Sequence, residues 1–250
     1  SAYIGQRGSH RGNAVGVCGD PRRQDAGGGT LLRGIFVTGT ETGVGKTVVS
    51  AALMHRYRGS TVRYWKPVQT GIEQDDDTAE VRRLSGCSAS GVVDEGIRLA
   101  HAVSPHLAAR LNNTAIDVDA TAGMLGMRAH DSSWIVEGAG GVFVPLNDTA
   151  LMVDLMSRLG LPALVVSRSA LGTINHTLLT LDALARRSIR VAGVVMTGPP
   201  NPDNREAIER WGRVRVLGEL PPLAPLSPEA LQSWAEAELD VTGALGEHLS

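Results

Sequence analysis

The stretch Thr38-Gly-Thr-Glu-Thr-Gly-Val-Gly-Lys-Thr47 decides the fold, and the apolar run Ile35-Phe36-Val37 precedes it. An amphipathic stretch, Val48–Met54, follows it directly. A strand, a glycine-rich turn and a helix that opens on Gly-Lys-Thr form the arrangement of a phosphate-binding loop. Backbone N–H groups and the helix N-terminus attract phosphate oxygens there. We therefore expect Lys46 to reach the β- and γ-phosphates of a nucleotide, and the Thr47 hydroxyl to hold Mg²⁺.

The loop departs from the strict motif at one position. Thr40 stands where the motif has glycine, and Gly39 lies one residue too early. The alternative interpretation is a Gly/Thr-rich surface turn before an ordinary helix. The apolar run before the loop and the Gly-Lys-Thr triplet after it favour the phosphate-binding loop.

Composition limits the class of protein. The 250 residues are 42% hydrophobic and 20% charged, which suits one soluble globular domain. A net charge of −2 gives no broad basic field, so nucleic acid is not an expected partner. Cys18 and Cys87 are far apart and lie in no Cys/His cluster, which argues against a zinc site or disulfide framework and is compatible with the reducing cytoplasm. No stretch of 18 apolar residues occurs, so we expect no membrane span.

The N-terminal residues 1–33 have the composition of a disordered tail or leader. They contain Gly-Gly-Gly at 27–29 and scattered arginines, and they show no hydrophobic period. Such a segment cannot bury enough apolar surface to offset the entropy of ordering. Residues 34–250 are expected to form a single domain.

From residue 34 onward, strand-like apolar runs alternate with helical patterns, which predicts a doubly wound α/β domain. The runs Trp134–Val136 and Ala163–Val166 are apolar on consecutive residues, as in strands covered on both faces, so the sheet should be mostly parallel with helices on both faces. Strands are expected at Ile35–Gly39, Val62–Pro67, Trp134–Glu137, Ala163–Ser167, Val191–Thr197 and Val214–Leu217, and helices at Lys46–Arg58, Thr78–Leu84, Pro105–Leu111, Ala120–Ala129, Ala150–Leu159, Thr173–Arg187, Pro202–Trp211 and Pro228–Ala237.

Ligands of such sheets bind where the strands end, so the residues after each strand are the site candidates. Lys66 ends the second strand and Thr70 follows at the same edge. A second lysine near the phosphate loop would stabilise charge on transferring phosphoryl or carboxyl oxygens, although a lone lysine there would be read as a surface side chain. Asp77 and Glu137 are the candidate Mg²⁺ ligands, and Asp75 and Asp76 are expected to be mostly solvated.

Two later strand ends carry weaker signals. In the segment Ser167–Thr177, Ser169 or Thr173 would cap the following helix, and free N–H groups there would either bind a carboxylate or simply be capped. The turn after Val191–Thr197 is of the kind against which a nucleotide base often rests, but its pattern alone indicates only a strand end and a turn. The proline-rich segment 219–226 is expected to be a connection that could pass over the base.

Taken together, these motifs resemble the dethiobiotin synthetase family, the ATP-dependent carboxylases of biotin synthesis. The resemblance spans residues 34 to about 226. The combination and its order are specific, whereas the phosphate loop alone is shared with a large superfamily. The matching pieces are the phosphate loop, Lys66-Pro-Val-x-Thr-Gly71, Asp77, Ser104-Pro-His106, Glu137-Gly-Ala-Gly-Gly141, Leu171-Gly-Thr-Ile-Asn-His-Thr177 and Gly193-Val-Val.

The resemblance implies a cytoplasmic ligase that acts on 7,8-diaminopelargonic acid with CO₂ or bicarbonate and MgATP. It assigns Lys46 and Lys66 to catalysis, with Lys46 on the phosphates and Lys66 on the carbamate. It also implies a homodimer, in which the helix start near Leu171 receives the substrate carboxylate of the neighbouring subunit. The implied nucleotide contacts are Thr42, Gly43, Val44, Gly45, Lys46, Thr47, Val48, Thr197 and Gly198; the substrate contacts are Thr40, Lys66, Thr70, Gly138, Leu171, Gly172 and Asn175; and the metal ligands are Thr47, Asp77 and Glu137.

The chain departs from the family pattern at two nucleotide positions. Gly43 occupies a loop position where some members carry glutamate, so no side chain there can touch nucleotide or metal. Thr197 stands where some members have an asparagine that reads adenine. We therefore expect other nucleoside triphosphates to substitute for ATP.

Two other functions share the phosphate loop and the fold. Amidating synthetases of the cobyrinate type usually need a glutaminase domain, for which 250 residues leave no room. Partitioning-type ATPase switches carry an extra loop lysine where this chain has Glu41. Hydrolysis driven by a partner protein, with no need for a diamine, would favour the switch.

Overall fold

Strand β1 (Arg33–Gly39) occupies the centre of the main sheet, and its side chains alternate between two hydrophobic clusters. In the computed structural model, which describes residues 32–127 and 132–250, Ile35 and Val37 pack on one face of the sheet and Phe36 on the other. All three side chains are fully buried. Because successive side chains of a strand point to opposite faces, this pattern requires cover on both faces.

Seven strands form the main sheet in the order β4-β2-β6-β1-β7-β8-β9, and every neighbouring pair is parallel. Strands β3 and β5 form a separate parallel pair. The predicted doubly wound α/β fold is therefore confirmed. The elements are β1 (Arg33–Gly39), α1 (Lys46–Arg56), β2 (Val62–Trp65), β3 (Val68–Thr70), α2 (Asp77–Ser85), the 3₁₀ turn η1 (Ala89–Gly91), β4 (Val92–Val93), β5 (Ile97–Leu99), α3 (Pro105–Leu111), α4 (Val118–Gly126), β6 (Ser133–Gly141), α5 (Met152–Leu159), β7 (Ala163–Arg168), α6 (Thr173–Arg186), β8 (Val191–Thr197), α7 (Pro202–Gly212), β9 (Val216–Leu220), α8 (Pro228–Glu238) and α9 (Gly246–Leu249).

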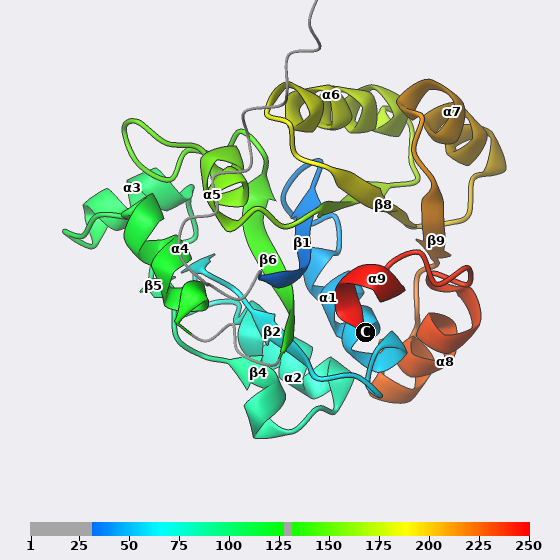
Figure 1. The fold of residues 1–250 in the computed structure, drawn as a ribbon, viewed down its shortest axis with the longest axis horizontal. Coiled ribbons are helices and arrows are strands. Elements are labelled where there is room, and N and C mark those ends of the chain that lie inside the picture. The colour runs from blue at the N-terminus through cyan, green and yellow to red at the C-terminus, as the bar shows by residue number, and fades with distance from the viewer. Residues whose placement is uncertain (1–31, 128–131) are drawn as a thin grey trace, which may run out of the picture. The chain divides into compact units, whose positions relative to one another are not determined.

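Helices cover both faces of the sheet (Figure 1). On one face, α1, α2, α8 and α9 pack against Ile35 and Val37 through buried side chains such as Leu53 and Trp234. On the other face, α5, α6 and α7 bury Met156 and other apolar side chains with Phe36. The parallel strands all end at one edge of the sheet, which is the edge that carries the phosphate-binding loop after β1.

Several strands differ from their predicted extents, and β6 and β9 differ most, for identifiable reasons. β6 does not end at Glu137 but runs on to Gly141, because the glycine-rich stretch continues to pair with β1, placing Gly141 opposite Gly39. β9 begins later than predicted and continues through Gly218. That glycine is tolerated in the strand because the Trp234 ring packs directly over it, so that a Cβ there would lie 3.2 Å from the ring.

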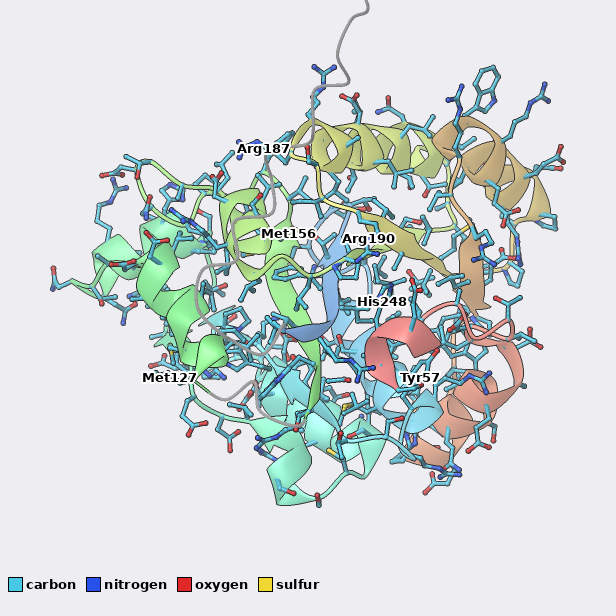
Figure 2. All side chains as sticks on the ribbon, viewed as in Figure 1. Tyr57, Met127, Met156, Arg187, Arg190 and His248 are labelled. Atoms are coloured by element: carbon cyan, nitrogen blue, oxygen red, sulfur yellow. The ribbon has the colours of Figure 1, made fainter. Side chains whose placement is uncertain are left out.

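A buried carboxylate fixes the C-terminal segment to the end of helix α1, where it bonds Tyr57, which is labelled in Figure 2. Asp240 is only 1% exposed, and it accepts hydrogen bonds from the Tyr57 hydroxyl and from the backbone N–H groups of Ala244 and Leu245. Burial and the hydrogen bond to Asp240 raise the pKa of Tyr57, so its hydroxyl stays a donor at neutral pH. Both oxygens of this buried carboxylate therefore accept hydrogen bonds from the protein.

Residues 1–31, which make up most of the expected tail, lie outside the described residues, as does the predicted end of the helix Ala120–Ala129. Among the helices of the described residues, none combines the length and the apolar character needed to cross a bilayer. Residues 32–250, apart from 128–131, make up the part of the chain on which the following sections rest.

Candidate active site

The phosphate-binding loop connects β1 to α1 and curls over its own lysine. Gly43 and Gly45 have positive φ angles of 72° and 92°, a conformation that side chains rarely adopt. Gly45 caps α1 without any side-chain hydrogen bond, which leaves helix N–H groups for a ligand. The Lys46 ammonium donates to the backbone oxygen of Glu41, a residue of the same loop, at 3.1 Å.

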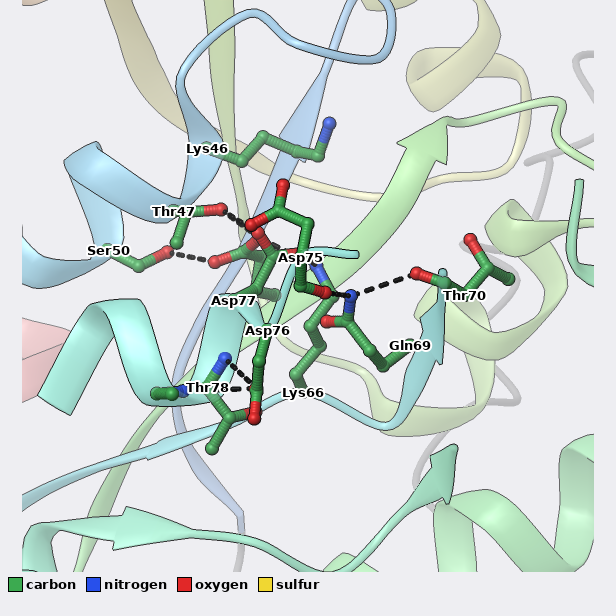
Figure 3. A network of polar contacts seen from close by, with 12 residues as sticks. Lys46, Thr47, Ser50, Lys66, Gln69, Thr70, Asp75, Asp76, Asp77 and Thr78 are labelled. Carbon is green, nitrogen blue, oxygen red and sulfur yellow. Dashed lines mark hydrogen bonds and ion pairs between the residues drawn. The ribbon is translucent and has the colours of Figure 1, made fainter. Parts of the chain in front are cut away.

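Glu137 is the buried centre of the site, with no exposed surface. One carboxylate oxygen, Oε2, accepts hydrogen bonds from Ser50 Oγ and Tyr64 Oη, each at 3.0 Å. The other oxygen, Oε1, lies 2.8 Å from Lys66 Nζ and 3.1 Å from Thr47 Oγ1. Its neighbours Thr47, Ser50 and Lys66 are labelled in Figure 3. These four polar neighbours come from α1, from β2 and from the turn after β2. They hold the buried carboxylate in one position, which makes it a rigid support for a cation.

Asp77 completes the cluster from the first turn of α2. Its Oδ2 lies 2.5 Å from Lys66 Nζ, and its Oδ1 accepts a hydrogen bond from Thr47 Oγ1 at 2.7 Å. Asp76 caps the same helix by accepting from the N–H groups of Thr78 and Ala79 (Figure 3). Asp76 and Asp75 are exposed, as the sequence predicted. The cap therefore fixes the helix start, and the helix start places Asp77 on Lys66.

The surroundings of the two lysines shift their pKa values in opposite directions. Burial lowers the pKa of Lys46 to about 8, and the nearby Lys66 ammonium adds to this effect, while Glu137 partly opposes it. Burial also disfavours the charge on Lys66, but Glu137 and Asp77 outweigh it and raise its pKa. Burial likewise opposes the charge on Asp77, yet Lys66 holds its pKa below the ordinary value. Lys66 is thus a permanent cation, whereas Lys46 titrates near physiological pH.

The affinity for nucleotide is expected to depend on pH through Lys46. A triphosphate binds the protonated amine, so binding is strong below the pKa of about 8 and weakens by about tenfold for each pH unit above it. Titration of a fluorescent ATP analogue between pH 7 and 9.5 measures this slope. Lys46→Arg should give a flat profile whatever its absolute affinity. A flat profile for the native protein would contradict the assignment of Lys46 to the phosphates.

The residues around Thr47 fit a Mg²⁺ ion. A hydroxyl and two carboxylates are hard oxygen donors, and Mg²⁺ usually takes only one or two carboxylates together with phosphates and waters. One oxygen of Asp77 faces the Lys66 ammonium and the other faces Thr47. Asp77 can therefore bond Lys66 and, together with Thr47, also hold Mg²⁺. No cluster of three His, Cys, Asp or Glu side chains suited to a metal occurs in residues 32–127 and 132–250.

A cavity of about 800 Å³ brings together most of the predicted site residues. It joins the phosphate loop to Lys66, Thr70, Asp77 and Glu137. A smaller pocket of about 210 Å³ shares Gly43, Gly45 and Val48 with that cavity and continues to Val44, Thr197, Gly198, Leu220, Pro221, Pro222, Leu223 and Leu226. The proline-rich segment therefore lines the second pocket, and the two hollows meet at the glycines of the phosphate loop.

Several predicted site residues lie elsewhere. Gly138 is buried against the Phe36 ring, where a Cβ would lie 2.8 Å from a ring atom, and Ala139 and Gly140 line the cavity in its place. The reason is the pleat of β6, which turns Gly138 to the face opposite Glu137, whereas the positive φ of Gly140, 65°, breaks the alternation. Thr40 lines a separate groove of about 740 Å³. Leu171, Gly172 and Asn175 are exposed and line neither the main cavity nor the smaller pocket.

Two polar partners of Glu137 were missed in the sequence, although one of them carried a usable signal. Ser50 lies one helical turn after Thr47, so both face the same side of α1. Tyr64 lies in β2, where it reads as an ordinary core aromatic. Gln69, at the variable position of the Lys66 motif, also lines the cavity and donates through Nε2 to the backbone oxygens of Thr70 and Asp75.

A parallel sheet, a phosphate-binding loop and carboxylates beside its Gly-Lys-Thr define a P-loop nucleotide-binding protein. Comparison with known proteins agrees: residues 33–230 match the AAA domain family. The chain is 51% identical to an ATP-dependent dethiobiotin synthetase of Paramagnetospirillum magneticum over 77% of this chain and 89% of that protein. It is 46% identical to the one of Agrobacterium fabrum over 80% of this chain and 92% of that protein. The chain therefore belongs to the ATP-dependent dethiobiotin synthetase family.

Solved structures with low sequence identity share the fold. A ParA family ATPase from Chlorobium tepidum superimposes with a TM-score of 0.56 at 12% identity, covering 86% of this chain and 99% of that one. The cell division ATPase MinD of Pyrococcus furiosus gives 0.51 at 17% identity, covering 82% and 98%. At these identities the likeness concerns the fold alone.

Proposed function

We propose that this protein is an ATP-dependent dethiobiotin synthetase that carboxylates 7,8-diaminopelargonic acid with CO₂ and closes the ureido ring in biotin biosynthesis. The observation that carries the proposal is the contact of the Lys66 ammonium with both Asp77 and Glu137 in the cavity that also holds Lys46. Family membership supplies the reaction. The site supplies what that reaction needs, which is concentrated positive charge beside bound phosphate. A cytoplasmic location belongs to the same proposal.

The chemistry gathers negative charge at one place. One amine of the substrate captures CO₂ as a carbamate, the γ-phosphoryl group passes to a carbamate oxygen, and the second amine attacks the carbonyl carbon and expels phosphate. Lys46 would hold the phosphates and Lys66 the carbamate, so each anion has its own cation. Mg²⁺, held by Thr47, Asp77 and Glu137 together with the phosphates, would neutralise charge on the transferring group. Thr70 lines the substrate end of the cavity.

The substrate end is completed by a second subunit in this proposal. Leu171, Phe143 and Leu179 are 104%, 58% and 60% exposed, and the latter two line the 740 Å³ groove beside Thr40. Such apolar exposure near one groove is typical of an interface. Leu171, Gly172 and Asn175 would then reach the active site of the partner rather than their own.

Leu171→Asp is expected to convert the dimer to monomer and to remove turnover, because a carboxylate would be buried in the contact. Analytical ultracentrifugation and steady-state assays measure the two effects. Val241→Asp, at a position 66% exposed near the C-terminus, is the matched control and should leave the dimer intact. A native protein that sediments as a monomer at micromolar concentration while fully active would refute the shared site.

Base selectivity is expected to be weak. The Thr197 hydroxyl donates to the backbone oxygen of Val44 at 2.8 Å, so its proton is already used inside the protein. The pocket around it is otherwise lined mainly by apolar side chains, including Leu223 and Leu226. A pocket whose hydroxyl is already hydrogen-bonded within the protein discriminates poorly between bases.

Mass spectrometry of products after incubation with diamine, bicarbonate and each of the four nucleoside triphosphates tests the function and this selectivity together. Dethiobiotin should form with all four, at rates within about tenfold of one another. ADP formation should require both diamine and bicarbonate. Equal ATP turnover without diamine would instead support a switch ATPase, and the synthetase assignment would fail.

A further inference from the structure

Arg98 is a partly buried cation in the middle of β5, opposite Gln69 of β3, and the proposed chemistry does not use it. Its guanidinium bonds to the main chain of the catalytic lysine. Nη1 donates to the backbone oxygen of Lys66 at 2.9 Å, and Nη2 donates to the backbone oxygen of Asp94 at 2.8 Å. Nη2 also lies 3.4 Å from Thr78 Oγ1. One side chain thus joins three segments that surround Lys66.

The turn at Lys66 and Pro67 depends on donors from outside for its shape. Its two carbonyl oxygens are held by Arg98 and by the N–H of Ile97, which donates to the Pro67 oxygen at 2.8 Å. Gly96 makes this approach possible. A Cβ there would lie 2.7 Å from Arg98 Nη1 and 2.8 Å from the Lys66 oxygen, too close for any side chain. Gly96, directly before β5, therefore leaves the space in which Arg98 bonds the Lys66 carbonyl oxygen.

The other end of the clamp reaches the helix that carries Asp77. Thr78 follows Asp77 in the first turn of α2 and is only 2% exposed. Arg98 thus links the backbone of Lys66 to this turn, and the Lys66 ammonium lies 2.5 Å from Asp77 Oδ2. A guanidinium fork can bond several acceptors at once in fixed directions, which an ammonium cannot do.

We propose that Arg98 is a positioning residue for Lys66: by clamping the Lys66 carbonyl to the start of α2, it holds the Lys66 ammonium on Asp77 and Glu137. Arg98 contacts no reacting atom and acts only through Lys66 and α2. The catalytic consequence rests on the proposed function, but the effect on Lys66 itself does not.

The sequence provides a direct readout, because Lys46 and Lys66 are the only lysines among the 250 residues. Amine labelling with acetic anhydride, followed by peptide mass spectrometry, therefore reports on these two side chains and on the chain's α-amino group. In the native protein Lys66 is held by two carboxylates and should label slowly, whereas Lys46 has a single hydrogen bond and should label faster. Arg98→Met should raise Lys66 labelling several-fold relative to Lys46.

Arg63→Met is the matched control. Arg63 is also partly buried, donates to a backbone oxygen, that of Ser90, at 2.9 Å, and stacks on the Trp134 ring at 5.3 Å, but it has no contact with Lys66. It should lose comparable thermal stability without changing the labelling ratio. Arg98→Lys, which keeps the charge but not the fork, should fall between Arg98→Met and the native protein, and it carries the test if Arg98→Met does not fold.

Turnover gives the second readout. Arg98→Met should lower kcat by about 10–100-fold, as small displacements of a reacting group do, while the affinity for an ATP analogue stays within about threefold of native. A labelling ratio unchanged by Arg98→Met, or equal to that of Arg63→Met, overturns the proposal. A changed ratio in a protein that makes no dethiobiotin would sustain the role of Arg98 and refute the proposed function instead, so the two failures are distinguishable.

Discussion

Replacing Lys66 by alanine is expected to reduce dethiobiotin formation by at least about 10²–10³-fold, the loss typical of removing one group that stabilises charge in the transition state. Lys66 is 3% exposed and its ammonium lies within 2.8 Å of two carboxylates, so no solvent cation reproduces its position. Nucleotide binding should survive, because Lys46 and the loop do not depend on the ammonium for their contacts. Product formation by mass spectrometry and analogue binding by fluorescence separate the two effects.

Lys66→Arg is the informative companion variant. It restores the positive charge, but its planar fork does not match the position of a compact ammonium between Asp77 and Glu137, so turnover should remain low. Recovery of activity in this variant would show that charge alone suffices. Native-like turnover in Lys66→Ala would remove the second cation from the mechanism altogether.

Glu137→Gln is expected to destabilise the folded protein strongly. The amide keeps the shape but removes the charge that faces Lys66 in a region without solvent. Breaking a buried ion pair costs about 3–5 kcal/mol of unfolding free energy, and the remaining pair with Asp77 places the expected loss near the lower end, about 3 kcal/mol. Urea denaturation monitored by circular dichroism measures it, and activity with MgATP should fall in parallel.

Glu236→Gln serves as the comparison for this stability effect. Its carboxylate also pairs with a cation, Arg58 at 2.7 Å, but the side chains are 46% and 60% exposed. Exposed pairs contribute roughly 0–1 kcal/mol, so this variant should unfold almost as the native protein does. If both glutamine variants unfold alike, Glu137 is not the electrostatic centre of the site.

A parallel sheet with helices on both faces could be predicted from the sequence because the phosphate loop is a strong local signal. The phosphate loop identifies the apolar run directly before it, β1, as a strand. The apolar runs in β6 and β7 identify strands that are covered on both faces. The cluster of Lys46, Thr47, Asp77 and Glu137 followed from the rule that parallel strands end at one edge. These residue types were predictable because their chemistry has few alternatives.

The missing parts depend on contacts between segments that carry no local signal. β3 and β5 are three residues each, and they are stabilised by pairing with each other rather than by a hydrophobic period. Arg98 looks like an ordinary charged residue until Gly96 and the Lys66 carbonyl are seen beside it. The family resemblance implied a substrate contact at Gly138, but the space beside this glycine is taken by the Phe36 ring.

The restriction of lysine to two positions has a practical consequence for spectroscopy. Protein made with ¹⁵N-labelled lysine would contain two labelled side-chain nitrogens, one on the phosphate loop and one between Asp77 and Glu137. Each end of the reaction path thereby has its own isotopic reporter, with no surface lysine to overlap it. Filling of either end by a ligand should shift one resonance and leave the other as an internal standard.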